Sequence, residues 1–132
     1  MYDRAVKRYQ QVRAATSSPS QILLALYDGL FRFLNGAKAC FEGGHATRGR
    51  EQAVKAHSII SELYIALDYD VFPELCGHLS GVYGYCLDEL ISAMRDGKAE
   101  HIDDVLRALA PLRDAWHTAV RQGSQPPVAA TG

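Results

Sequence analysis

Histidine and cysteine are the side chains of this 132-residue chain that most readily bind a transition metal. A metal site needs several ligands at one point, yet Cys76 and His78 are two residues apart and point to different sides of a helix. The five histidines are scattered along the chain, at positions 45, 57, 78, 101 and 117. We therefore predict no bound metal.

Acidic side chains could serve as calcium ligands or as catalytic carboxylates. An EF-hand loop that starts at Asp68 would need glycine in place of Pro73 and glutamate in place of Leu79, so we expect no calcium site. Asp28 is a lone acid rather than half of a spaced carboxylate pair. No phosphate-binding loop, dinucleotide-binding glycine motif or nucleophile elbow occurs in a plausible context. These observations predict that the protein is not an enzyme and uses no cofactor.

The charge of the chain does not favour nucleic-acid binding. Fourteen Lys and Arg residues against fifteen Asp and Glu residues give a net charge of -1, which creates no global positive field. Basic residues among two tyrosines near the N-terminus superficially resemble a nucleic-acid-binding strip, at positions 4, 7, 8 and 13. Because nothing elsewhere reinforces this charge, we interpret the segment as a solvated arm and predict no nucleic-acid partner.

Cysteine number and hydropathy indicate the cellular compartment. Cys40, Cys76 and Cys86 are odd in number and form no paired framework, which suits the reduced thiols of a cytosol. The first thirteen residues carry charges with no apolar run behind them, so they do not predict a secretory signal. No stretch approaches the roughly 20 uncharged apolar residues that span a bilayer. We predict a cytoplasmic protein that does not insert into a membrane.

The elements that would position any site are helices. Apolar residues recur every three or four positions in four stripes, over residues 23–41, 53–67, 75–93 and 102–120. Ser18, Pro19 and Gln21 form the pattern of a capped helix start, and Gly97 suits the left-handed residue after a helix. Pro111 lies inside the last stripe and predicts a bend there.

Four such helices with short connections predict an all-α fold, an antiparallel up-down-up-down four-helix bundle. The bundle covers residues 18–122, preceded by an N-terminal arm (1–17) and followed by a disordered tail (123–132) that has no periodicity. We expect the core to contain five large side chains: Leu30, Phe33, Leu63, Leu79 and Trp116.

Two helices carry more uncharged surface than a bundle core needs. Beside its core stripe, the third helix has a second uncharged face that includes Tyr83, Leu87 and Ile91, next to a glycine strip at 77, 81 and 84. The second helix has a similar strip with Val54, Ser58 and Ile65. These faces either pack on neighbouring helices or form a groove for an amphipathic segment of a partner. The groove interpretation makes the protein a binding module with these six residues as contacts.

Several motifs resemble those of one family. The segment SSPSQILLALYDGL at 17–30 resembles the opening Ser-Pro-x-Gln-Leu-Leu-x-x-Leu-Tyr-Asp-Gly motif of the flagellar secretion chaperones for flagellin, the FliS family. The segments VYGY at 82–85 and RDAW at 113–116 are similar to later family motifs, in the same order and at compatible spacing. The chain departs from the pattern at residues 70–73, at His78, which replaces an asparagine, and at Gly84, which replaces an aspartate.

The resemblance implies a four-helix bundle and a function. Members of this family bind the C-terminal segment of flagellin in the cytoplasm, prevent premature polymerisation and help delivery to the flagellar type III export gate. Val6 and Tyr9 stand at the family's apolar arm positions and complete the implied contact set. The alternative is a helical adaptor or regulatory protein with a non-flagellin partner, which could self-associate as a homodimer through the same strips.

Overall fold

The computed structural model describes residues 18–123, and all four helices that the periodicity predicts are present in it. They are α2 (Pro19–Glu42), α3 (Ala46–Ile65), α4 (Pro73–Asp96) and α5 (Ala99–Arg121). The described part of the chain contains no strand, so the all-α prediction is confirmed. The predicted arm and residues 124–132 of the predicted tail lie outside the described residues.

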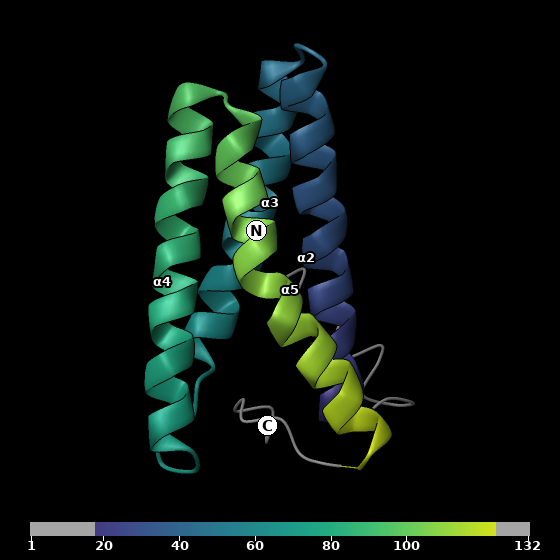
Figure 1. Cartoon of the computed structure of the whole chain (residues 1–132), viewed down its shortest axis with the longest axis vertical. Coiled ribbons are helices and arrows are strands. Elements are labelled where there is room, and N and C mark those ends of the chain that lie inside the picture. The colour runs from purple at the N-terminus through teal and green to yellow at the C-terminus, as the bar shows by residue number, and fades with distance from the viewer. Residues whose placement is uncertain (1–17, 124–132) are drawn as a thin grey trace.

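Each helix packs against two neighbours. Helix α2 packs against α3 and α5, and α4 packs against the same two helices. Figure 1 shows the four long helices side by side, with short connections at the ends of the bundle. It also shows α5 bending part-way along its length, as expected from Pro111, which cannot donate the backbone hydrogen bond of its turn.

Capping interactions that the sequence predicts determine where two of the helices begin or end. Gln21 donates its backbone N–H to Ser18 Oγ at 3.2 Å, and the Ser18 backbone N–H donates to Gln21 Oε1 at 3.0 Å, completing the predicted capping box. Gly97 follows α4 with a φ of 68°, the left-handed conformation that glycine adopts without strain, and its N–H donates to the carbonyl of Ala93 at 2.8 Å.

Helix α3 begins seven residues before its apolar stripe. In these first turns the buried residue is Gly49. It lies so close to the ring of Phe41 that an added Cβ would be 2.6 Å from a ring carbon. A buried glycine allows close packing because it has no side chain, so it does not appear in a pattern of apolar residues. The stripe therefore marks only the later turns of this helix.

The core lies between the four helices. Four of the five expected core residues, Leu30, Leu63, Leu79 and Trp116, are at most 6% exposed. Phe33 is only half-buried, and the ammonium group of Lys55 lies 5.5 Å from its ring centre. Burial of these apolar side chains is the main driving force for forming the bundle.

Removal of the Ser18 side chain tests the helix cap. We expect Ser18→Ala to lower the free energy of unfolding by about 1 kcal/mol, because the backbone N–H of Gln21 loses its partner. Ser20→Ala, in the first turn of the same helix, is the matched control and should change stability by no more than about 0.5 kcal/mol. Equal effects of the two substitutions in urea denaturation would contradict the capping role.

Candidate functional site

Large exposed apolar side chains gather at one end of the bundle. Of nine such residues in the described part of the chain, six fall within residues 64–75. We call them the apolar end: Tyr64, Ile65, Tyr69, Val71, Phe72 and Leu75. They belong to the last turns of α3, the connection that follows and the first turn of α4. In Figure 1 this connection lies at the end of the bundle at which α2 begins.

Asp68 organises the connection that carries these side chains. Its carboxylate accepts the backbone N–H of Asp70 at 3.1 Å, and its carbonyl accepts the N–H of Val71 at 3.2 Å. The same carbonyl accepts the Sγ–H of Cys76 at 3.3 Å, which ties the turn to α4. Leu67 is 7% exposed and anchors the segment in the core. Asp68 therefore fixes the backbone of the turn, whose large apolar side chains face solvent.

A second apolar surface follows the junction of α3 and α4. Glu89 faces α5, because its carboxylate contacts His101 of that helix. Ile91 is about 200° around the helix from Glu89, and it is three residues before Met94, whose carbonyl accepts a hydrogen bond from α3; Ile91 therefore lies toward α3. On α3, Arg50 donates its Nε–H to the carbonyl of Met94 at 2.6 Å, so Val54, one turn later, borders α4.

Apart from Tyr83, the sequence-predicted contact residues divide into three groups. Val54, Ile65 and Ile91 are 50%, 76% and 49% exposed. Ser58 and Leu87 are half-buried, and Leu87 packs partly against the core. We call four of these residues the α3–α4 face: Val54, Ser58, Leu87 and Ile91. Ile65 belongs to the apolar end. Val6 and Tyr9 form the third group and lie outside the described residues.

The placement of Tyr83 on a partner-facing surface is wrong. Its side chain is fully buried, and its hydroxyl lies 2.5 Å from the hydroxyl of Tyr27. Because α4 packs against both α3 and α5, its buried arc is wide enough to enclose this tyrosine. Burial raises the pKa of Tyr27 to about 12 and that of Tyr83 further still, so both phenols stay neutral and each satisfies the other's hydroxyl.

Sequence reasoning missed most of the apolar end. Leu75 was expected in the core but is 39% exposed, while Tyr64, Tyr69, Val71 and Phe72 were not singled out. The signal that could have found them is the presence of large apolar residues within a turn-forming segment, where no helical face is available to bury them.

The glycine strip of α4, formed by Gly77, Gly81 and Gly84, is not covered by other side chains. A Cβ added to Gly77, Gly81 or Gly84 would meet no atom within 4 Å. The backbone of this helix is consequently accessible to close approach by another chain along that strip.

Opposite effects are expected from alanine at Gly81, inside α4, and at Gly97, which follows α4. Gly81→Ala should raise the free energy of unfolding by about 0.5–1 kcal/mol, because the methyl group has space and glycine disfavours a helix interior. Gly97→Ala should instead destabilise by about 1 kcal/mol, because its φ of 68° strains any residue with a Cβ. Urea denaturation measures both, and a loss of stability in Gly81→Ala would show that the strip is not open.

Asp28, which the sequence indicates to be a lone acid, has two basic partners on α5. Arg113 of α5 donates to Asp28 Oδ1 at 3.1 Å, and His117 Nε2 lies 3.5 Å from the same oxygen. The guanidinium of Arg113 also stacks 4.8 Å from the ring centre of Phe31. These motif residues therefore connect α2 to α5, and their role in this structure is to hold the bundle together.

Comparisons with known proteins agree with the motifs. A family model described as "Flagellar protein FliS" matches residues 1–123. The flagellar secretion chaperone FliS of Bacillus subtilis is 29% identical over 113 residues, covering 86% of this chain and 84% of its own length. That of Salmonella typhimurium is 30% identical over 116 residues, covering 84% and 86%. Among the helices of the described residues, none has the length and apolar character needed to span a bilayer.

Proposed function

Because the chain belongs to the FliS family of flagellar secretion chaperones, we propose that it binds the C-terminal segment of flagellin in the cytoplasm. Binding prevents premature polymerisation and aids delivery to the flagellar type III export gate. The observation that carries this proposal is the apolar end, where six large side chains remain in contact with water. Exposed apolar surface of this kind is typical of sites that receive another protein chain.

The proposed contact surface joins the apolar end to the α3–α4 face. Ile65 in the last turn of α3 and Val54, eleven residues earlier and on the same side of the helix, are both exposed. Amphipathic helices of a client would place their apolar residues on these positions, the helix-in-groove mode of recognition. We include Val6 and Tyr9 in the contact set on the strength of the family pattern alone.

The chaperone acts by occupying the polymerising segment of flagellin. The family consists of chaperones rather than enzymes, and no reaction needs to be catalysed. A flagellin segment that folds onto the bundle cannot pair with a second flagellin at the same time. Ordering a client chain costs conformational entropy, so useful affinity requires a large contact surface, and two apolar surfaces provide more area than one.

Calorimetric titration of a flagellin C-terminal peptide into the purified full-length protein tests the proposal. We expect saturable binding, and light scattering should show one chaperone chain per peptide. In a second assay, a small amount of flagellin filament seeds is added to flagellin mixed with an equal amount of the chaperone. The seeds should then not grow. A protein that remains dimeric and does not bind the peptide would instead support the self-associating adaptor.

A further inference from the structure

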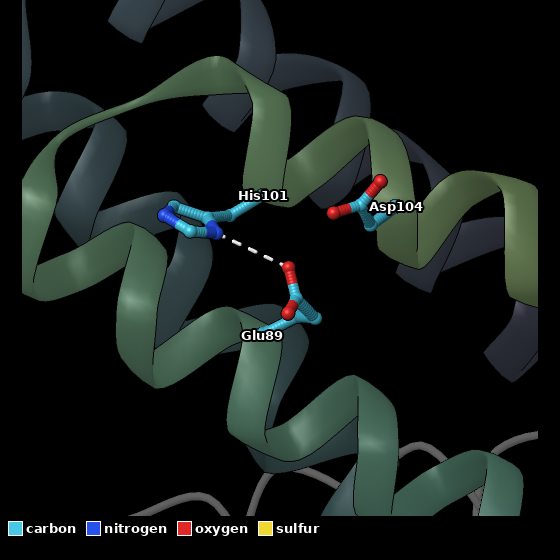
Figure 2. Close-up of side chains that lie close together, drawn as sticks. All are labelled: Glu89, His101 and Asp104. Atoms are coloured by element: carbon cyan, nitrogen blue, oxygen red, sulfur yellow. Dashed lines mark hydrogen bonds and ion pairs between the residues drawn. The ribbon is translucent and has the colours of Figure 1, made fainter.

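Glu89 of α4 and His101 and Asp104 of α5 form a cluster at the end of the bundle opposite the apolar end. One ligating atom from each of the three lies within 4.8 Å of the others. Figure 2 shows the carboxylate of Glu89 and the imidazole of His101 facing each other from two helices, with Asp104 beside them. All three side chains are half-buried. The sequence analysis could not detect this set because one member is on a different helix from the other two.

Both nitrogens of the His101 ring are held in place. Nδ1 lies 3.1 Å from Glu89 Oε1, and Nε2 lies 3.1 Å from Asp96 Oδ2. Asp96 is itself fixed by Arg95, whose Nε–H donates to its Oδ1 at 3.0 Å. A histidine that ligates a metal commonly has its second nitrogen bonded to a carboxylate, which sets the orientation and basicity of the ring. His101 has this arrangement with Asp96 as the outer carboxylate.

Three carboxylates, those of Glu89, Asp96 and Asp104, lie around His101. Asp104 offers a carboxylate oxygen within 4.8 Å of the ligating atoms of Glu89 and His101. Carboxylates that lie close together repel each other unless a proton or a cation lies between them. Arg95 pairs with Asp96, and Arg107 pairs with Asp104, whereas the carboxylate of Glu89 pairs with the imidazole of His101.

We propose that Glu89, His101 and Asp104 bind one divalent transition-metal ion, with Zn²⁺ as the best match. Imidazole combined with carboxylates suits Zn²⁺, whereas Ca²⁺ and Mg²⁺ prefer six or more oxygen ligands. His101 would ligate through Nδ1. Arg107 bonds Asp104 Oδ1 at 2.7 Å, so the other oxygen of that carboxylate would ligate. Water would complete a tetrahedral site.

Such an ion would link α4 to α5 next to their short connection. Fourteen residues separate Glu89 from Leu75, which is about 21 Å along a helix, so the metal site is distinct from the apolar end. Ile91 of the α3–α4 face is two residues from Glu89 but about 200° around the helix, so the metal site is also on a different side of α4 from that face. The inference therefore does not depend on flagellin binding, and either one can fail without the other.

Metal titration of the tag-free, full-length protein, dialysed against a chelator, tests the site. We expect calorimetry to show one Zn²⁺ per chain, and His101→Ala and Glu89→Gln each to abolish this binding. Asp96→Asn should weaken it by about 10–100-fold, as is typical of outer carboxylates. His78→Ala removes an exposed histidine of the same helix α4 and should leave the affinity unchanged. Circular dichroism of the metal-free variants checks that the bundle remains folded.

Cobalt substitution identifies the donor atoms. Co²⁺ bound to the wild-type protein should give visible d–d bands without the intense near-ultraviolet absorption of cobalt–thiolate bonds. Affinity should also fall as the pH drops, because protons compete with the metal for the imidazole nitrogen. Absence of Zn²⁺ binding, equal binding by His101→Ala, or a thiolate band would each overturn the proposal.

Discussion

Aspartate in place of Ile65 or Ile91 is expected to abolish binding of the flagellin C-terminal segment and to leave the fold nearly unchanged. The two side chains are 76% and 49% exposed, so a charge at either position remains hydrated in the free protein. When the client docks, that charge would have to lose its water, which costs several kcal/mol without a compensating partner. Affinity should fall by at least about 100-fold, whereas the free energy of unfolding should change by about 1 kcal/mol or less.

A matched control separates loss of the contact from a general effect of added negative charge. Ala110→Asp places the same charge on an exposed position of α5, away from both apolar surfaces, and should bind the client normally. Calorimetry measures affinity, and urea denaturation measures stability. Unchanged affinity in both isoleucine variants would exclude the proposed contact surface. Large losses of stability would show that these side chains are packed rather than exposed.

Most of the fold could be predicted because its determinants are local. The capping pattern at Ser18 and Gln21 needs only four residues of sequence, and both hydrogen bonds form as expected. The left-handed Gly97 likewise follows from residue type and position at a helix end. Hydrophobic periodicity then indicates which residues are helical, because a 3.6-residue repeat describes no other regular structure.

The orientation of α4 could not be predicted as well. Periodicity identifies a stripe but not how wide an arc the neighbouring helices cover, and both Leu75 and Tyr83 lie near its edges. Tyr83 is buried because the hydroxyl of Tyr27 is available to it. That partner is 56 residues away in the sequence, and no local pattern shows that a polar atom has a match in the core.

The same limitation applies to the surfaces. The middle of the apolar end is a turn, in which the carboxylate and the carbonyl of Asp68 accept backbone N–H groups. Helical spacing cannot assign the side chains of a turn to a face. The cluster around His101 combines residues of two helices that are brought together only by packing. Helical spacing alone leaves open whether Val54, Ile65 and Ile91 are exposed or packed, because the uncharged face of α4 that carries Ile91 also carries the buried Tyr83.

Alanine substitution of two leucines one turn apart on α4 tests how this helix is oriented. Leu79 is 1% exposed and belongs to the core, so Leu79→Ala should cost about 2–5 kcal/mol through lost burial and the cavity left behind. Leu75 is 39% exposed, and Leu75→Ala should cost less than about 1.5 kcal/mol. Both side chains belong to the stripe that the sequence assigns to the core, so the contrast depends on the structure alone. Urea denaturation with an unchanged m-value measures it, and equal losses would show that α4 turns Leu75 toward the core.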